Sequence, residues 1–413
     1  MNSNLLVHGH VAIDPPKGVE VWDVDPYDPE ILRNPTEYYA ELRAKGPFVY
    51  IPKYSVLACG RYAETREVFS DWERFVSSRG VGLTDFAMTP PWREPSIILE
   101  VDPPVHTVAR RVLARALSPR AVLNLREAFA GSAVRLIEEI LERGGRVEAV
   151  AELAEIFPTE VFPRALGLRE TDARRLVDFG AMVFNALGPD NDLQKTTFAR
   201  APDVVPWIAE RCARESLLPD GFGSIIYAAA GDGEITEREA SLLVRSLLSA
   251  GVDTTVTGVG NALWCLVNYP DQFELLKSDP RKARNVFEEA LRLTSPVHTF
   301  CRTARQTTEV SGITIPDHAK ILCVLGAANL DPVQWEDPNQ FLIDRKLAGH
   351  IAFGAGIHGC VGQNVARAEG EAVIKAIAER VDRIVPDGDA EWRPNNAVRA
   401  LDRLPIHMVA KHL

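Results

Sequence analysis

A single cysteine near the C-terminal end of the chain lies in a glycine-rich run whose residue types suit metal binding or nucleophilic chemistry. Residues 352–362 read AFGAGIHGCVG, with Cys360 as the cysteine, and apolar residues at helical spacing follow them. Glycine tolerates positive φ and lets backbone or a flat ligand approach closely. At the start of a helix, free backbone N–H groups favour thiolate over thiol. The run therefore predicts that Cys360 is a nucleophile or a metal ligand, with a buried cysteine at an ordinary turn as the alternative.

A second stretch, residues 243–255 (LVRSLLSAGVDTT), predicts a buried helix because most of its residues are apolar. Thr236 provides an N-cap signal at the start of this helix. Buried polar groups need partners or a cavity, and Gly251 removes a side chain beside Asp253 and Thr254. The pattern is typical of a helix that passes over a flat ligand. A packing seam rich in serine and threonine is the alternative.

Three weaker patterns also carry charged residues at spacings that suit a site. A proline pair precedes a predicted helix in which His106 and Arg110 share one face at i and i+4. Glu289 and Arg292 lie three residues apart in another predicted helix, and a loop over 76–95 is long enough to be functional. Taken alone, the first pair is typical of a solvated helix start, and the second occurs by chance in many helices.

These residues must be positioned mainly by helices. Residues 119–187 predict successive amphipathic helices, whereas 47–57 and 296–324 have the β-branched and aromatic content of short strands. We therefore expect a mainly α fold with small β-sheets. Because the patterns described above must meet at one site, we also expect a single domain over 1–413 rather than the two or three that the length suggests.

Composition narrows the function classes. Hydrophobic residues make up 46% and charged residues 25%, as in ordinary globular proteins, and the net charge of −11 argues against nucleic acid as the main partner. Six scattered cysteines with no C-x-x-C pair suit reduced thiols. No signal-peptide pattern occurs at the start, and the most apolar segment, 242–267, contains Arg245 and Asp253. We expect a cytoplasmic protein that does not span a membrane.

The motifs occur in the order found in the cytochrome P-450 family. The run F-x-x-G-x-H-x-C-x-G ending at Gly362 resembles the cysteine-ligand loop of that family, in which the thiolate is the proximal haem ligand. Residues 243–255 are similar to its oxygen-binding helix with an acid–alcohol pair. Glu289, Arg292 and, after a D-P-x-x-F segment, Arg345 resemble its Glu-Arg-Arg network beneath the haem. The resemblance covers roughly residues 93–365 and implies a fold that holds haem b between the long central helix and the cysteine loop.

The resemblance also implies a role for each matching residue. Cys360 is the axial iron ligand, whose thiolate favours O–O cleavage, and Phe353 shields its sulfur. Asp253 and Thr254 are the pair that delivers protons for the reaction of the co-substrate O2. The residues implied to hold the haem propionates are His106, Arg110, Arg302 and His350.

A closer resemblance links the chain to bacterial monooxygenases that demethylate or hydroxylate para-substituted benzoic acids such as 4-methoxybenzoate. Such a substrate needs a cation and hydroxyl donors for its carboxylate and apolar walls for its ring. The substrate contacts implied are Arg93, Ser96, Leu99, Phe184, Arg245, Ser246, Ser249, Ala250 and Phe300. Leu187, His298 and Cys301 depart from those enzymes, which carry Phe, Gln and Phe there. The arginines have a simpler alternative role, as partners of surface carboxylates.

Electrons are expected from separate proteins, because no reductase segment is expected within the 413 residues. The resemblance implies an iron–sulfur ferredoxin and a flavin-dependent ferredoxin reductase fed by NAD(P)H. Because such ferredoxins are acidic, Arg110, Arg111, Arg115 and Arg120 are candidates for a basic docking face.

Three other functions remain open. A cysteine hydrolase would use Cys360 with His358, although residues two apart on a tight loop rarely align as nucleophile and base. A haem-binding sensor without turnover would not need Asp253 and Thr254. The same oxygen chemistry on a different small apolar substrate is the third, whereas a peroxide-using enzyme would normally lack the acid–alcohol pair.

Overall fold

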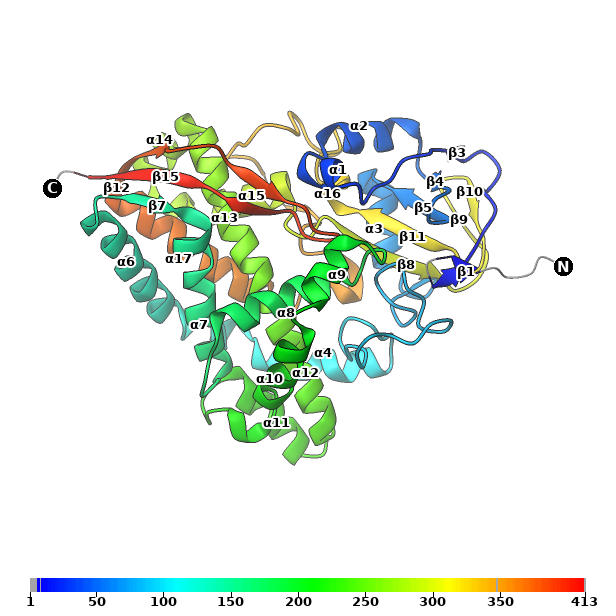
Figure 1. Cartoon of the computed structure of the whole chain (residues 1–413), viewed down its shortest axis with the longest axis horizontal. Coiled ribbons are helices and arrows are strands. Elements are labelled where there is room, and N and C mark those ends of the chain that lie inside the picture. Colours follow the sequence, from blue (N-terminus) through cyan, green and yellow to red (C-terminus); the bar gives the residue numbers. More distant parts are fainter. Residues whose placement is uncertain (1–5, 8, 347, 412–413) are drawn as a thin grey trace.

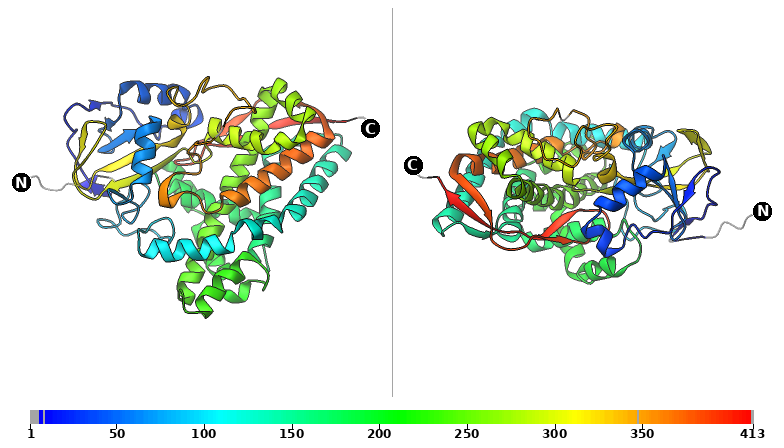
Figure 2. Two further views of the ribbon diagram at one scale, coloured as in Figure 1. Left: turned by 180° about the vertical axis from the view of Figure 1, so that it is seen from behind. Right: turned by 90° about the horizontal axis from the view of Figure 1, so that it is seen from above.

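The computed structural model describes residues 6–7, 9–346 and 348–411. The molecule has a triangular outline and is thinner in the third direction, with helices filling the larger part and most strands gathered on one side (Figures 1 and 2). The helices are α1 (Pro29–Arg33), α2 (Thr36–Lys45), α3 (Tyr62–Ser70), α4 (Val105–Ala116), α5 (Pro119–Leu123), α6 (Arg126–Glu142), α7 (Ile156–Leu166), α8 (Ala173–Asn185), α9 (Asp192–Phe198), α10 (Ala201–Arg211), α11 (Phe222–Gly231), α12 (Glu237–Gly251), α13 (Asp253–Asn268), α14 (Pro270–Ser278), α15 (Ala283–Thr294), α16 (Leu325–Ala328) and α17 (Gln363–Arg380). The strands are β1 (Leu6–Val7), β2 (His10–Val11), β3 (Glu20–Val21), β4 (Val49–Ile51), β5 (Val56–Cys59), β6 (Phe75–Val76), β7 (Arg146–Glu148), β8 (Thr299–Ala304), β9 (Thr308–Val310), β10 (Ile313–Ile315), β11 (Lys320–Val324), β12 (Val381–Pro386), β13 (Glu391–Arg393), β14 (Ala400–Arg403) and β15 (Pro405–Ala410). The expected mainly α fold with small sheets is confirmed.

Helix α13 lies at the centre of the helical part and is buried along most of its length. It packs against α8, α15 and α17, and α17 runs beside α6 (Figure 2). A helix buried on nearly all sides must lie inside a core, where its polar side chains need partners. One hydrophobic cluster contains residues from Tyr27 to Met408, and two smaller clusters lie beside it among the described residues. Because the first cluster joins residues from near both ends of the chain, it is the observation in favour of the single domain that we propose for residues 1–413.

The predicted long helix after Thr236 is divided into two. Its N-terminal end is as expected, because the Thr236 side chain accepts a hydrogen bond from Glu239 N and the Glu239 side chain accepts one from Thr236 N. However, α12 ends at Gly251 and α13 begins at Asp253, with Val252 between them at φ −99° and ψ −67°. The hydroxyl of Thr254 donates to the carbonyl of Ala250, 2.6 Å away. The break therefore falls at the predicted acid–alcohol pair.

The largest sheet has the strand order β3-β4-β5-β11-β8-β6. Strand β8 is antiparallel to β11, with Arg302 opposite Ile321 and Cys301 opposite Leu322. Because successive side chains of a strand point to opposite faces, Phe300 and Arg302 face one side and Cys301 the other. Smaller sheets contain β12-β15-β7 and β13-β14. Among the described residues, no helix combines the length and the apolar character needed to cross a lipid bilayer.

Candidate functional site

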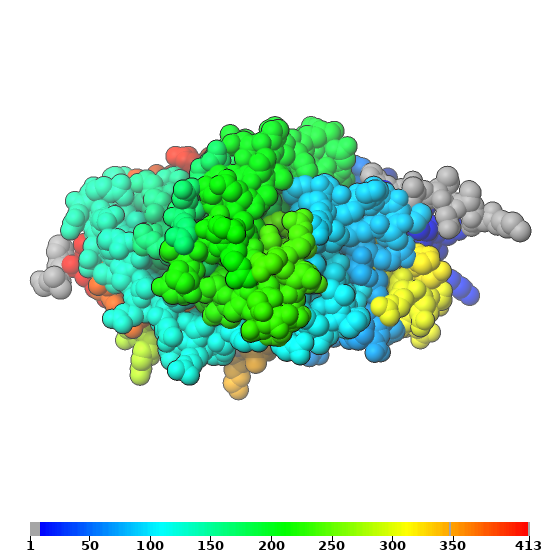
Figure 3. Space-filling model, turned by 90° about the horizontal axis from the view of Figure 1, so that it is seen from below, coloured from blue at the N-terminus to red at the C-terminus, as the bar shows by residue number. Residues whose placement is uncertain are grey.

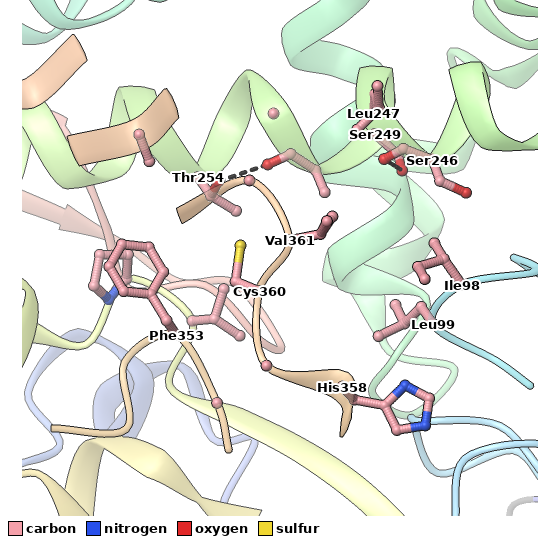
Figure 4. Close-up of a pocket in the computed structure, with 18 of the residues that line it drawn as sticks. Ile98, Leu99, Ser246, Leu247, Ser249, Thr254, Phe353, His358, Cys360 and Val361 are labelled. Carbon is pink, nitrogen blue, oxygen red and sulfur yellow. Dashed lines mark hydrogen bonds between the residues drawn. The ribbon is translucent and has the colours of Figure 1, made fainter. Parts of the chain in front are cut away.

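One cavity lies where the cysteine loop, α12, α13, β8 and the loop before α4 meet (Figure 4). The predicted site residues that line it are Arg93, Ser96, Leu99, Arg110, Phe184, Ser246, Ser249, Ala250, Thr254, Phe300, Arg302, Phe353 and Cys360. The cavity has a mostly apolar wall with polar groups at two ends. One end contains the cysteine loop and Arg302, and the other contains the serines of α12 and Arg93. Of the residues predicted to contact haem, oxygen or substrate, His106, Arg245, Asp253 and His350 do not line it.

Glycines shape the loop that presents Cys360. Gly354 and Gly356 have φ values of +72° and +67°, which L side chains rarely adopt. A Cβ at Gly356 would also lie 2.7 Å from the Cα of Ser70. The loop closes through a hydrogen bond from Cys360 N to Phe353 O at 2.8 Å. The sulfur points into the space below Thr254 (Figure 4), so the loop holds it toward the cavity.

The environment of Cys360 favours a metal ligand over a nucleophile. Burial raises the pKa of its thiol, although the N–H groups of Gly362 and Gln363 and the charge of Arg110 act in the opposite direction. The amides at the helix start do lower the pKa of the thiol, as the sequence predicts, but desolvation outweighs them in the structure. A metal ion deprotonates a coordinating thiol outright. A hydrolase, in contrast, would need a base beside the thiol.

Buried cations and imidazoles surround the cysteine end. Arg302 is 2% exposed, donates to the carbonyl of Cys301 and stacks over Phe69. The charge of Asp102 acts on it, but no ion pair is formed with it in the described part of the chain. The rings of His106 and His358 are 4.4 Å apart, and His106 Nε2 has no hydrogen-bond partner among the described residues. His358 has no hydrogen bond within 3.5 Å there, but its Nε2 lies 3.8 Å from a carboxylate oxygen of Asp102. Burial lowers the pKa of His106 to about 4. Unpaired buried groups of this kind are costly without an anion, so the donor set fits the two propionates of a haem.

The structure reassigns one propionate contact. His350 lies outside the cavity lining, and its Nε2 is 2.7 Å from a carboxylate oxygen of Glu288. His358, two residues before Cys360, lines the cavity instead. Arg110 lies at the same end and donates to the carbonyl of Gly359 at 2.5 Å. We therefore replace His350 by His358 among the candidate propionate contacts.

The predicted acid–alcohol pair is split between two environments. Thr254 lines the cavity, whereas Asp253 is 0% exposed and neither of its carboxylate oxygens has a hydrogen-bond partner among the described residues. Burial raises the pKa of Asp253, and the nearest cation, Arg393 on β13, counteracts this at 3.8 Å. A Cβ at Gly180 of α8 would lie 2.5 Å from that of Asp253, so this glycine admits the acid. Arg393 was missed because no local pattern links it to residue 253.

The opposite end of the cavity presents hydroxyl groups and one guanidinium. Ser96 Oγ and Ser246 Oγ are 2.8 Å apart, and Ser249 lies one turn from Ser246 (Figure 4). Arg93 lines the cavity, with one terminal nitrogen 3.2 Å from Glu100 and its Nε buried without a partner in the described structure. The hydroxyls of Ser246 and Ser249 donate to the helix carbonyls of Leu242 and Ser246 at 2.9 and 3.0 Å, so in the described structure Arg93 Nε is the donor of this end that is left without a partner.

Arg245 acts on the loop rather than on the cavity. Its guanidinium donates to the carbonyls of Glu94 and Pro95 at 2.6 and 3.3 Å. Burial and the nearby charge of Arg93 lower its pKa to about 10. Figure 3 shows the loop segment, in light blue, against the green helical surface. The structure thus makes Arg245 a support for the loop that carries Arg93.

Of the three residues that depart from the benzoate enzymes, only Leu187 lines the cavity. His298 is buried beside the carbonyl of Asn395, and Cys301 faces the other side of β8, with its N–H bound to Val81 O at 2.7 Å. Of the three departures, the one at Leu187 is therefore the one that affects the cavity wall.

The Glu-Arg-Arg network has the expected contacts. Glu289 accepts two hydrogen bonds from Arg292 at 2.7 and 2.8 Å and one from Arg345 at 3.0 Å. Arg292 also donates to the carbonyls of Asn329 and Pro338. The network ties α15 to the segment that precedes the cysteine loop.

A buried acid on α17 was missed by sequence reasoning. Glu369 is 0% exposed, and neither of its oxygens has a hydrogen-bond partner among the described residues. Burial raises its pKa well above the usual range, with the hydroxyl of Thr255 as a nearby counteracting group. The only signal in the sequence was a carboxyl beside Ala368 in the apolar pattern that follows Cys360.

Comparison with known proteins adds three findings. The Cytochrome P450 family model matches residues 282–404. Cytochrome p450 CYP199A2 of Rhodopseudomonas palustris (strain ATCC BAA-98 / CGA009) is 47% identical over 391 residues, which are 95% of this chain and 95% of that protein. The beta-dihydromenaquinone-9 omega-hydroxylase of Mycobacterium tuberculosis (strain ATCC 25618 / H37Rv) is 31% identical over 94% of this chain and 79% of its own length.

Solved structures agree with these matches. Cytochrome P450 CYP109Q5 from Chondromyces apiculatus superposes with a TM-score of 0.79 at 29% identity, over 95% of this chain and 99% of that one. CYP109E1 from Bacillus megaterium in complex with testosterone gives a TM-score of 0.79 at 26% identity, over 92% of this chain and 99% of that one.

Proposed function

Because the chain belongs to the cytochrome P450 family and is thus a monooxygenase that uses haem b and O2, we propose that it oxidises a small, para-substituted aromatic carboxylic acid. For a 4-methoxy substituent, insertion of oxygen into a methyl C–H bond gives a hemiacetal, which breaks down to the phenol and formaldehyde. The reaction consumes O2, two electrons and two protons and releases one water.

The observation that carries the proposal is the polar end of an otherwise apolar cavity. Arg93 supplies a cation there, and Ser96, Ser246 and Ser249 supply hydroxyl groups. Small-molecule sites typically combine apolar walls with a few convergent polar groups that fix orientation. A carboxylate bound at this end would direct the para substituent of its ring away from the serines, toward Cys360.

The cysteine end has the residues to hold the haem. We assign Cys360 as the iron ligand and His106, Arg110, Arg302 and His358 as partners of the propionates, where hydrogen bonds to charged groups are strong. When bound, the haem activates O2 and supplies one oxygen atom to the substrate. The protein contributes the ligand, water exclusion and protons, and Thr254 is the candidate hydroxyl for delivering protons in the cavity.

We further propose a ferredoxin and a flavin-dependent ferredoxin reductase as the electron supply from NAD(P)H. The structure leaves only part of the predicted docking face available. Arg110 is directed at Gly359 O, and Arg115 pairs with Glu234 at 2.8 Å. Arg111 and Arg120 are exposed and are the remaining candidates.

A ligand titration tests the substrate class. We would titrate the haem-loaded protein with 4-methoxybenzoate and with its uncharged analogue 4-methoxybenzyl alcohol, and follow the low-spin to high-spin absorbance shift. We expect the carboxylate to give the larger shift and the tighter binding. With ferredoxin, reductase and NADH, 4-methoxybenzoate should then yield 4-hydroxybenzoate and formaldehyde. No shift with any benzoate, together with a shift from a neutral terpene, would favour a different apolar substrate.

The reduced, carbon-monoxide-bound spectrum tests the assignment of Cys360. A thiolate ligand gives the red-shifted band characteristic of the family. The Cys360→Ser variant should lose that band, whereas a Cys301→Ser variant, changed on the far face of β8, should keep it.

A further inference from the structure

The connection between α8 and α9 forms part of the cavity wall although it has no regular structure. Phe184, in the last turn of α8, and Leu187, just beyond it, both line the cavity. Irregular segments are normally the mobile parts of a fold. This one is held on both sides by segments that are far away in the sequence.

On one side, three asparagines bind the connection to the turn between β13 and β14; we call Asn185, Asn191 and Asn396 the asparagine tie. Asn396 N donates to Asn185 Oδ1 at 3.0 Å, and Asn396 Nδ2 donates to Asn185 O at 2.9 Å. Asn191 Nδ2 donates to Asn396 Oδ1 at 2.8 Å, and Asn396 Nδ2 lies 3.2 Å from Asn191 Oδ1. Asn185 and Asn396 are 4% and 0% exposed. The tie therefore satisfies the side chain and the backbone N–H of Asn396 without water.

On the other side, the loop before α4 closes over the same connection. Leu83 N donates to Leu187 O at 2.9 Å. A Cβ at Gly82 would lie 2.5 Å from Leu187 O, and one at Gly188 would lie 2.5 Å from Cγ of Asn396. Glycine is thus required at both close approaches, and residues 186–188 are enclosed between two segments.

Apolar packing places the tie directly behind the wall. Phe184 packs in a small cluster with Ala397, Val398 and Ala400, to which Leu187, Val297 and Phe300 add partly buried faces. The 396–399 segment is in turn bound to the cavity wall, with His298 N donating to Ala397 O at 3.0 Å and Arg399 N to Pro296 O at 2.8 Å. A change at Asn396 therefore reaches two wall residues that it does not touch.

We propose that Asn396 is a positioning residue that holds Phe184 and Leu187 in the closed wall and so sets how fast ligands of ring size pass to and from the haem. The proposal rests on the proposed function only in that the cavity holds haem, and it requires no carboxylate on the ligand. Loss of the tie should release residues 185–191 while the haem end stays intact.

The Asn396→Ala variant of the haem-loaded protein tests this. Its matched control is Asn268→Ala, because Asn268 is exposed and makes a single bond from Nδ2 to Trp264 O at 2.8 Å. Stopped-flow spectroscopy would follow 4-phenylimidazole, an aromatic ligand of haem iron, and imidazole, which is small enough to need less opening. Losing one or two net hydrogen bonds corresponds to about a tenfold change in the rate at which the ligand dissociates. We expect 4-phenylimidazole to dissociate about tenfold faster, imidazole to change less, and the control to match the parent.

Hydrogen–deuterium exchange gives a readout that does not depend on haem chemistry. Peptides covering 185–191 and 394–398 should exchange faster in Asn396→Ala, and peptides from α13 and α17 should not. The Asn396→Asp variant keeps the side-chain shape and the acceptor for Asn191 but loses the Nδ2 donor to Asn185 O, so it serves if the alanine variant does not fold. Unchanged dissociation and local exchange in a folded variant, or faster exchange throughout the chain, would overturn the proposal.

The proposed substrate class and the tie can fail separately. If benzoates produce no spin shift but 4-phenylimidazole leaves faster from Asn396→Ala, the substrate class is wrong and the tie stands. If benzoates bind and turn over but both imidazoles leave at parental rates, the tie is wrong and the substrate class stands.

Discussion

Replacing Ser246 by alanine should weaken the binding of a benzoate much more than that of its neutral analogue. In the structure, Ser246 Oγ lies 2.9 Å from Leu242 O and 2.8 Å from Ser96 Oγ. The hydroxyl of Ser246 therefore donates to the helix carbonyl, and the hydroxyl of Ser96 is left to donate to Ser246 Oγ. A bound carboxylate would turn a serine hydroxyl toward itself and accept a hydrogen bond from it.

The magnitude follows from the exchange of one hydrogen bond for another. A hydrogen bond to a charged group contributes about 1.5–3 kcal/mol, and the neutral bond that is given up contributes about 1 kcal/mol. The difference, roughly 0.5–2 kcal/mol, corresponds to about a 2- to 30-fold increase in Kd, since about 1.4 kcal/mol is tenfold. Removing the hydroxyl leaves the helix carbonyl of Leu242 within its helix, so we expect little loss of stability.

The assay is the spin-state titration of the Ser246→Ala variant with 4-methoxybenzoate and 4-methoxybenzyl alcohol. We expect the Kd of the acid to rise within the range above and that of the alcohol to change by less than about threefold, because it carries no charge to stabilise. Equal losses for both ligands would show that the alanine reshapes the cavity. No loss for the acid would place its carboxylate elsewhere and refute the assignment of this end.

Three further predictions follow from the site and its supports. Thr254→Ala should slow product formation by about a hundredfold, the lower end of the usual contribution of a positioned proton donor. It should also release more hydrogen peroxide per NADH while the substrate-induced spin shift is retained; coupling equal to that of the parent would refute it. The second prediction concerns Glu288. Burial opposes the ionisation of this carboxyl, but hydrogen bonds from His350 and Arg367 lower its pKa to about 2. This carboxylate therefore stabilises the fold above its ordinary pKa, and its contribution is lost as the pH falls from about 4.5 toward 2. The free energy of unfolding of Glu288→Gln, measured in urea, should depend less on pH than that of the parent. A slope equal to that of the parent would count against the pairing. Arg111→Glu should raise the KM for ferredoxin and flatten its salt dependence, and unchanged ferredoxin turnover would remove this residue from the docking face.

The residues at the haem end of the cavity could be predicted from the sequence better than those at the substrate end. Its chemistry is local: the glycines, His358 and Cys360 lie within one run, and the Glu289–Arg292 pair needs only one helical turn. His350 is the propionate contact that the structure reassigns, and it lies eight residues before His358 in the same segment. Only the fold shows that His350 pairs with Glu288 and that the ring of His358 lies beside that of His106.

The supports of the cavity could not be read from the sequence because they join distant segments. Arg393 reaches Asp253 from β13, and Asn396 reaches Asn185 across more than two hundred residues. The resemblance implies that Arg245 contacts the substrate, yet in the structure its guanidinium donates to the carbonyls of Glu94 and Pro95 in the loop. No periodicity within a segment reports such contacts.

The break at Val252 explains why Asp253 and Thr254, which the sequence predicts as an acid–alcohol pair, have different surroundings. In an unbroken helix, about 100° per residue would place Ser249, Ala250 and Thr254 at about −60°, +40° and +80° relative to Ser246, and Asp253 between them at about −20°. The four neutral residues do line the cavity, but Asp253 does not. Since α12 ends before the acid and α13 begins with it, the second helix is free to direct Asp253 toward Gly180 and Arg393. The break thus converts one stripe into a cavity face that meets the ligand and a buried acid that is kept away from it.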